Sequence, residues 1–254
     1  AIRNVNQLIT QEKNQHVLLE EACRLLVETR GFHNAWIIRL DAGKPVEPFY
    51  WAGFDGGFEV LAEELRAGRL PDCAEAALRT GDTQVVAAPA SSCGQCPLAE
   101  EYGGRAGVTA RLEHEGQLFG LLGVSVPERF ARDSNELSLL NEVAGDLAFA
   151  LSSLRSEVQR VSVERKYASA LATTTDAVMA TDLDGTITLF NPGAERLFKC
   201  SAEAAIGTHV SRFCPEDLKD EQREMLRRAR EEGTVPGYET ERLTAENRRM
   251  PVEI

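Results

Sequence analysis

The 254-residue sequence has no excess of basic residues and no long apolar run. Its 28 Lys and Arg stand against 40 Asp and Glu, and this net charge of -12 disfavours DNA or RNA binding, which needs clustered cations. No run approaches the ~18 apolar residues that cross a bilayer, and the N-terminus lacks a signal-peptide core. We therefore expect a cytoplasmic segment without a membrane span; a membrane anchor elsewhere in a longer parent protein stays open.

Catalytic motifs are also absent. The sequence contains no P-loop, no kinase nucleotide-binding box, no GGDEF-like loop and no G-x-S-x-G. Its composition, 43% hydrophobic and 27% charged, is that of a folded globular protein, and its length suffices for two domains. The densest basic stretch, EMLRRARE at 224–231, is flanked by acids and indicates a solvated helix face. We expect no catalytic site within this segment.

Cysteines are few, and only three of the six fall in one region, namely Cys73, Cys93 and Cys96. Six are too sparse for a disulfide scaffold in a chain of this length, and Cys23 lies on an apolar helical pattern that indicates burial. Cys93 and Cys96 form a C-x-x-C in the loop SSCGQCPL. They are therefore the candidates for thiol or metal chemistry, with Cys73 as a third member.

Three interpretations of this cysteine cluster stay open. A C-x-x-C supplies two thiolates that can bind one zinc ion or an iron-sulfur cluster, with Cys73 as the third ligand. Cys93 and Cys96 can instead form a reversible redox disulfide, or all three thiols can be structural and unreactive. A closed metal site needs a fourth ligand, for which the candidates are His33, His114 and Asp72.

Periodicity and turn residues predict alternating helices and strands over the first half of the chain. The segment 5–30 has helical spacing, and the split at Leu70-Pro71 divides 57–82 into two helices, the second with Asp72 as a possible N-cap. Strands are expected at 35–41, 46–54, 83–89 and on both sides of the turn Glu115-Gly116. The last two strands carry dense apolar residues, so we expect them at the centre of an antiparallel sheet.

A long helix begins after Asp133 and carries a heptad repeat of apolar residues. The a/d positions are Leu137, Leu140, Ala144, Leu147, Leu151, Leu154, Val158 and Val161, and the spacing continues to Arg165 and Ala168. We expect a homodimer through residues 137–168. For 133–148 packing on the sheet is an equal alternative, whereas beyond Leu151 the helix is too polar for a core and a dimer seam explains it better.

The final third predicts a hairpin around Asp184-Gly185 and a helix capped by Asn191 with Pro192 at its first position. A helix at 215–233 and a strand at 238–245 follow. The closing RRMPVEI reads as the opening of another strand, for which we expect no partner within the chain.

Two family resemblances follow from these patterns. The stretch DGTITLFNPGAERLFKCSAEAAIG, followed by CPEDL, has the order of strand, D-G turn, strand and helix that resembles a PAS domain over 166–254. The stretch ARLEHEGQLFGLLGVSVPERFARDSNELSLLNEVAGDLAFAL is similar to the closing hairpin and final helix of a GAF domain, over 1–150. The resemblance implies an α+β chain: a GAF-like antiparallel sheet at 1–150, a signalling helix at 133–168, and a PAS-like domain at 169–254 with its last strands missing.

The order GAF, helix, PAS resembles the input region of bacterial two-component sensor histidine kinases, and similar inputs precede diguanylate cyclases. This implies a possible small-molecule ligand in the GAF-like part and a downstream kinase or other output domain. The alternatives are an enzyme similar to free methionine sulfoxide reductase, which is also a GAF domain, and a purely structural dimerisation module.

Known cofactors of these families find little support among the residues. Bilin-binding GAF domains carry a Cys-His pair, which is absent here, and Cys214 in SRFCPED does not reproduce the motif of flavin-adduct PAS domains. The position that resembles the haem-ligating His of PAS sensors is Gln222. Haem bound to the GAF-like part through His114 stays open, and His16, His33 and His209 are expected to be structural or surface residues.

Overall fold

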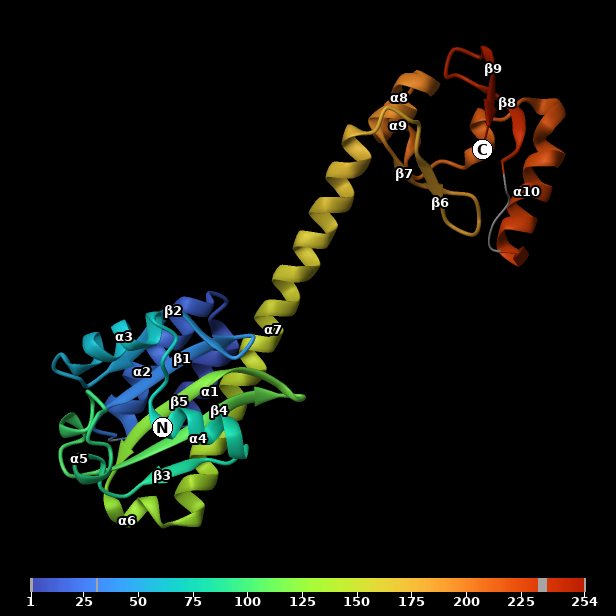
Figure 1. Ribbon diagram of the computed structural model, residues 1–254. Helices are drawn as coiled ribbons and strands as arrows, with labels where there is room; N and C mark the ends of the chain where they lie inside the picture. The colour runs from blue at the N-terminus through green and yellow to red at the C-terminus, as the bar shows by residue number, and fades with distance from the viewer. Residues whose placement is uncertain (1, 31, 233–236, 254) are drawn as a thin grey trace. The chain divides into compact units, whose positions relative to one another are not determined.

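The computed structural model describes residues 2–30, 32–232 and 237–253, which form two compact units, Ala1–Gln159 and Arg160–Ile254. Figure 1 shows a sheet covered by helices in unit 1 and shorter strands and helices in unit 2. The helix α7, Ser134–Thr173, begins in unit 1 and ends in unit 2.

Unit 1 is built on a five-stranded antiparallel sheet with the order β2-β1-β5-β4-β3. The strands are β1 Ala35–Asp41, β2 Lys44–Ala52, β3 Gln84–Val86, β4 Ala106–His114 and β5 Gln117–Val126. The β4–β5 turn has Glu115 at φ 50° and Gly116 at φ 77°, the left-handed conformations that a two-residue hairpin needs. Because β5 lies in the middle of the sheet beside β4, the predicted central position of these two strands is confirmed.

Helices cover both faces of this sheet, and the alternation of side chains along β1 assigns residues to each face. Ile37 points into the core formed with α2, Gln15–Arg30, and the first half of α7. Trp36 and Ile38 point into a second core with α3, Gly57–Arg66, and α4, Asp72–Thr80. The remaining elements of unit 1 are α1 Ile2–Gln11, α5 Pro89–Ser92, η1 Glu100–Tyr102 and α6 Glu128–Ala131. Cys23 is fully buried in the first core, as its helical pattern predicted.

Two local predictions for unit 1 are wrong. The segment predicted as one helix at 5–30 is divided into α1 and α2, because the Asn14 carboxamide accepts hydrogen bonds from the amides of His16 at 2.9 Å and Val17 at 3.4 Å. Asp72 does not cap α4: Pro71 occupies the N-cap position, and Asp72 is the first helical residue.

The apolar repeat of α7 changes its environment along the helix. Leu140, Ala144, Leu147 and Leu151 are buried against the sheet, whereas the side chain of Val158 is 70% exposed. The predicted homodimer through 137–168 therefore needs correction in its first half, because these residues already belong to the core of their own unit. The exposed apolar heptad position of the described helix, Val158, lies after Leu151.

Helix α7 is also the one helix in the described part of the chain that is long and apolar enough, by length and composition alone, to cross a membrane. This is weak evidence for a membrane span, and charged and polar residues such as Asp146 interrupt the apolar residues of the helix, so it contains no continuous apolar run of the predicted length. Its apolar residues from Leu140 to Leu151 serve as the core of unit 1, and a core helix of this kind passes the same test.

Unit 2 holds two antiparallel strand pairs, β6–β7 and β8–β9. Its strands are β6 Met179–Thr181, β7 Ile187–Phe190, β8 Glu239–Leu243 and β9 Arg249–Glu253; its helices are α8 Pro192–Phe198, α9 Ala202–Ala205, η2 Val210–Phe213, η3 Glu216–Leu218 and α10 Lys219–Glu232. Three aromatic rings form the centre of its core: Phe213 stacks on Phe190 at 5.7 Å and lies 4.6 Å from Phe198 between ring centroids. The expectation that the strand in RRMPVEI lacks a partner is wrong, because β9 pairs with β8 over five residues.

Asn191 joins the end of α7 to the start of α8. As predicted, its side-chain oxygen caps α8 by accepting the amide of Ala194 at 2.8 Å, and it also accepts the amide of Val178 at 2.7 Å. Its side-chain nitrogen donates to the carbonyls of Leu171 and Asp176, both at 3.0 Å. One buried carboxamide therefore holds the last turn of α7, the strand β6 and the helix α8 together.

Candidate functional site

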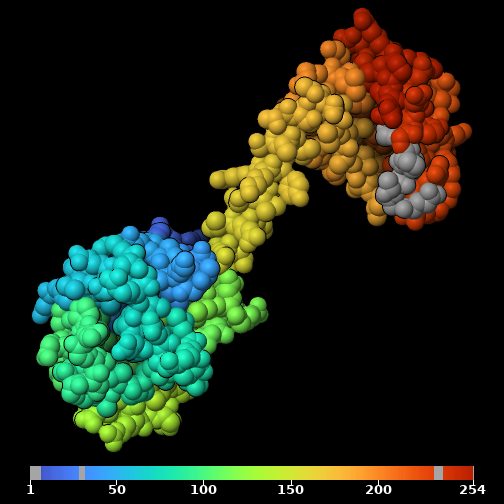
Figure 2. Space-filling model, in the orientation of Figure 1, coloured from blue at the N-terminus to red at the C-terminus, as the bar shows by residue number. Residues whose placement is uncertain are grey.

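The three clustered cysteines line one pocket of about 190 Å³ in unit 1. Cys73 comes from the first turn of α4, whereas Cys93 and Cys96 come from the loop that follows α5. Asp72 and Arg69 lie at the same pocket. In Figure 2 the cyan surface of the α3–α4 region and the green surface of the cysteine loop adjoin on the visible face of unit 1.

Successive turns fold the C-x-x-C into a compact loop. The amide of Cys93 donates to the carbonyl of Pro89 at 2.8 Å, and the amide of Cys96 donates to the carbonyl of Cys93 at 2.8 Å. Beyond the turns, the carboxylate of Glu101 accepts the amides of Asp55, at 2.8 Å, and of Gly57, which anchors the loop to the start of α3. The two thiols are thus placed by backbone hydrogen bonds and not by a disulfide: all six cysteines are free.

Burial governs the protonation of all three thiols. It raises the pKa of Cys96 to about 11 and raises the pKa of Cys73 against the opposing effect of a hydrogen bond from Thr109. Burial, followed by the negative charge of Asp72, also raises the pKa of Cys93. Since the thiolate is the nucleophile and the metal ligand, burial disfavours the reactive form of all three thiols.

The candidate fourth ligands are separated by the fold. Asp72 lies at the cysteine pocket. His114 packs its ring edge-on against Phe149 with centroids 5.1 Å apart, and His33 lies beside Gly103. Within the described residues, no group of three or more His, Cys, Asp or Glu side chains has an arrangement that would hold a metal ion.

The sheet face under α3 and α4 is filled by aromatic side chains. Trp36 is buried there with its indole nitrogen donating to the hydroxyl of Tyr102 at 3.2 Å, and Phe58 stacks on Trp51 at 4.4 Å. The indole of Trp36 occupies the space above Gly123, where an added Cβ would lie 2.0 Å from the ring. Pockets for small molecules usually measure roughly 300–1,000 Å³, so the 190 Å³ beside the cysteines suits an ion or a ligand of few atoms.

Sequence reasoning did not identify this filled face. The signal that was available is Gly123 in the middle of an apolar strand, because glycine inside a strand often marks the close approach of another group.

The two family-specific positions of unit 2 have structural roles in the described residues. Gln222 is buried and its side-chain oxygen accepts a hydrogen bond from Arg242 at 2.7 Å. Cys214 is buried as a free thiol.

Comparisons with known proteins agree with the two units. Residues 12–152 match the family model of the GAF domain, and residues 165–254 match that of the PAS fold. A search of curated proteins found no match.

Several solved structures are similar to this chain. The Escherichia coli DhaR(N)-DhaL complex is 15% identical over 98% of this chain and 80% of that chain, with a TM-score of 0.48. The free methionine-R-sulfoxide reductase of Neisseria meningitidis in complex with its substrate is 16% identical over 60% of this chain and 87% of its own, with a TM-score of 0.45. A PAS domain from Colwellia psychrerythraea is 28% identical over 36% of this chain and 77% of that chain, with a TM-score of 0.33.

Proposed function

This chain belongs to the GAF domain family and carries a PAS fold after the GAF domain, and from this premise we propose that it is the sensory input region of a bacterial signal-transduction protein. The output we propose is a two-component histidine kinase, with a diguanylate cyclase as the alternative output. We further propose that this region is cytoplasmic. The cysteine pocket of the GAF domain is the proposed input, and α7 is the proposed route to the PAS domain.

The continuity of α7 carries this proposal. Its first half is packed in the GAF core through residues such as Leu147, and the carbonyl of Leu171 near its other end accepts a hydrogen bond from Asn191 of the PAS domain. A change that shifts the packed half must move or rotate a helix that the PAS domain also holds. An effector shifts the balance between two positions of α7 only if it binds the GAF domain with a different affinity in each of them.

The cysteine pocket is the proposed place where such an effector acts. Its walls come from three segments, the end of α3, the start of α4 and the loop of Cys93 and Cys96. A metal ion that binds Cys73 together with Cys93 or Cys96 would draw α4 and the loop together, and a Cys93–Cys96 disulfide would tighten the loop that forms one wall of the pocket. Because α4 packs on β4 and the GAF core, this change reaches the sheet on which α7 lies.

The test is metal content and backbone hydrogen exchange of protein purified without oxygen. We expect a Cys93–Cys96 disulfide after mild oxidation, together with a change in exchange at residues 152–173; zinc or iron near stoichiometry would show instead that a metal ion draws the three thiols into a new arrangement. The double variant Cys93→Ser/Cys96→Ser should lose both effects, whereas Cys200→Ser, a buried cysteine of the PAS domain, should retain them. A folded, metal-free wild type whose α7 exchange is the same in reduced and oxidised protein would contradict the cysteine pocket as the input.

Dimerisation through the exposed half of α7 is the second part of the proposal. Val158 occupies a heptad a position and is 70% exposed, whereas Val163 lies outside the a/d seam and is 43% exposed. Val158→Asp should therefore convert a dimer to a monomer in light scattering, and Val163→Asp, the same chemical change on the same helix, should leave it dimeric. A wild-type monomer at micromolar concentration would refute this part.

A thiol enzyme similar to free methionine sulfoxide reductase is the second candidate, favoured by the three thiols at one small pocket. The raised pKa of each thiol argues against it, because such chemistry needs an activated thiolate. Turnover of free methionine sulfoxide by wild type, lost in Cys93→Ser or Cys96→Ser, would establish the enzyme.

A further inference from the structure

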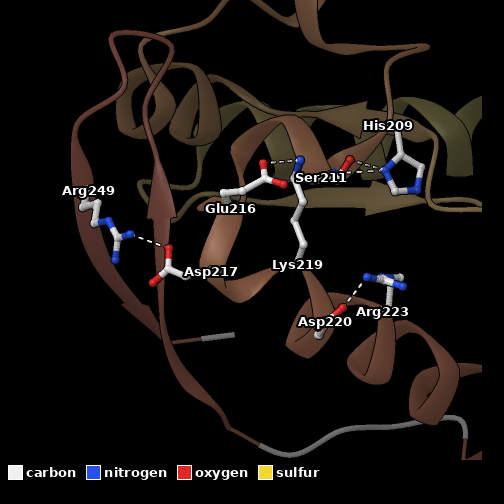
Figure 3. Close-up of polar contacts among 8 residues, drawn as sticks. All are labelled: His209, Ser211, Glu216, Asp217, Lys219, Asp220, Arg223 and Arg249. Atoms are coloured by element: carbon white, nitrogen blue, oxygen red, sulfur yellow. Dashed lines mark hydrogen bonds and ion pairs between the residues drawn. The ribbon is translucent and has the colours of Figure 1, made fainter.

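A pocket of about 440 Å³ in the PAS domain has four positively charged side chains among the ten described residues that line it. Lys219, Arg223, Arg227 and Arg230 contribute to it from α10, with spacings of four, four and three residues that place them on one helix face. Across from them lie η2 and the β6–β7 turn, and Figure 3 shows His209 and Ser211 from the η2 side and Lys219 and Arg223 from α10. This concentration of cations stands out in a chain of net charge -12.

The acids that pair with these cations lie farther out toward solvent. Glu216, the partner of Lys219 at 2.5 Å, is 86% exposed against 41% for the lysine side chain. Arg223 pairs with Asp220. Arg227 lies between Glu224 and Glu231, at 2.5 Å from each. Exposed pairs of this kind contribute about 0–1 kcal/mol each, so an anion in the pocket can compete for the cations.

Neutral hydrogen-bond donors complete the wall. The Nδ1 atom of His209 accepts the amide of Ser211 at 3.1 Å, so in the neutral ring the proton is on Nε2, which lies beside Gly185 in the β6–β7 turn. Gln222 also lines the pocket and its side chain is only 6% exposed. Its oxygen is engaged by Arg242, and its Nε2 has no hydrogen bond among those described, so this side-chain nitrogen is available as a donor at a residue that lines the pocket.

We propose that this basic pocket binds a small anion with at least two negative charges, a phosphate or a di- or tricarboxylate. The four cations and the Gln222 amide supply donors, and Asp184 is the one carboxylate among the lining residues that the structure describes. Planar guanidinium groups are suited to both carboxylate and phosphate oxygens. A volume of 440 Å³ lies within the usual range for small-molecule sites, roughly 300–1,000 Å³. The PAS domain then receives a chemical input of its own, independent of the cysteine pocket.

An anion in this pocket would also link two segments of the PAS domain, α10 and the β6–β7 turn. Arg230 donates to the carbonyl of Leu183 and lies 3.7 Å from Asp184, both in the β6–β7 turn. An anion that binds Arg230 together with Arg223 and Arg227 would draw α10 and this turn against the same ligand. We expect its binding to weaken steeply with salt, as the binding of a charged ligand to exposed cations does.

Nuclear magnetic resonance titration of the whole chain tests the proposal, with inorganic phosphate, citrate and neutral glycerol as probes. We expect saturable amide shifts in α10 and around His209 with phosphate, citrate or both, which identifies the anion class, and none with glycerol. The double variant Arg227→Gln/Arg230→Gln should weaken binding at least tenfold. Arg228→Gln is the matched control, because Arg228 lies on the same helix but lines a separate hollow with Tyr238.

The remaining outcomes distinguish binding of an anion in this pocket from binding to the basic residues of α10 in general. The Arg230→Lys variant keeps the positive charge, so its affinity for the anion should lie within a few fold of wild type. The same variant shows whether a substitution at this position disturbs folding. Absence of shifts with both anions would overturn the proposal. Equal weakening by Arg228→Gln would overturn it too, because binding would then follow the total charge of the helix.

Discussion

Asn191 offers the sharpest test of how the PAS domain is held to the signalling helix. The Asn191→Ala substitution removes the cap of α8 and the donor that holds the carbonyl of Leu171 at the end of α7. Loss of an N-cap costs about 1 kcal/mol. The amide of Val178 and the two carbonyls left without a partner are half-buried or exposed, and together they add about 1–2 kcal/mol. We expect the PAS domain to lose about 2–3 kcal/mol of stability.

Tryptophan fluorescence allows the unfolding of the two domains to be followed separately. The chain contains two, Trp36 and Trp51, and both belong to the GAF domain, so fluorescence follows that domain alone while far-ultraviolet circular dichroism follows both. With an m-value of about 1 kcal/mol/M, the urea midpoint of the PAS transition should fall by about 2–3 M. The fluorescence transition should not move.

The Asn191→Asp variant separates the stability contributed by the α8 cap from that contributed by the hydrogen bond to α7. It retains oxygen acceptors for the amides of Val178 and Ala194 but loses both donors, so its stability should lie between wild type and Asn191→Ala. A loss below about 0.5 kcal/mol in Asn191→Ala, the usual range of surface substitutions, would refute the structural role assigned to this residue.

Three further predictions concern the GAF domain. Leu147→Ala, at a fully buried position of α7, should cost about 2–5 kcal/mol in the fluorescence transition, and Leu154→Ala, at a partly buried position, clearly less; equal losses would contradict the burial gradient. Gly123→Ala should destabilise the domain by about 1–3 kcal/mol because its Cβ meets the Trp36 ring, whereas Gly145→Ala, which meets nothing within 4 Å, should be neutral or stabilising by about 0.5–1 kcal/mol. The reactivity of Cys96 can be measured by alkylation and mass spectrometry in a Cys73→Ser/Cys93→Ser variant. Alkylation should be slow at neutral pH and should accelerate, as the thiolate forms, up to a pH of about 11. A rate that reaches its plateau below pH 9 would show that burial does not raise the pKa of Cys96.

Much of the fold followed from local signals in the sequence. The turn at Glu115-Gly116, the cap at Asn191 and the break at Leu70-Pro71 each have a short-range physical cause, and the structure confirms all three. The break between α1 and α2 was missed because apolar residues keep helical spacing on both sides of Asn14, and its capping hydrogen bonds leave no mark on that pattern.

The site depended more on tertiary contacts. The sequence placed Cys73, Cys93 and Cys96 in one region, and the fold brings them to one pocket, but their raised pKa values come from burial by residues distant in the chain. The a/d spacing of α7 is the same on both sides of Leu151, so it was the polar composition after Leu151, and not the heptad repeat, that indicated where burial ends. The basic residues of α10 were interpreted as a solvated face because only the fold places η2 and the β6–β7 turn opposite them.

The close contact between Trp36 and Gly123 has a consequence for engineering. Replacing Trp36 by glycine would remove one indole from a buried apolar layer and leave the hydroxyl of Tyr102 without the hydrogen-bond donor it now has from that ring. Apolar holes of this kind stay dry and take up molecules of matching shape. Free indole would then fill the space of the missing side chain. The stability of the GAF domain in this variant would depend on the concentration of added indole, so folding could be switched on by a small molecule.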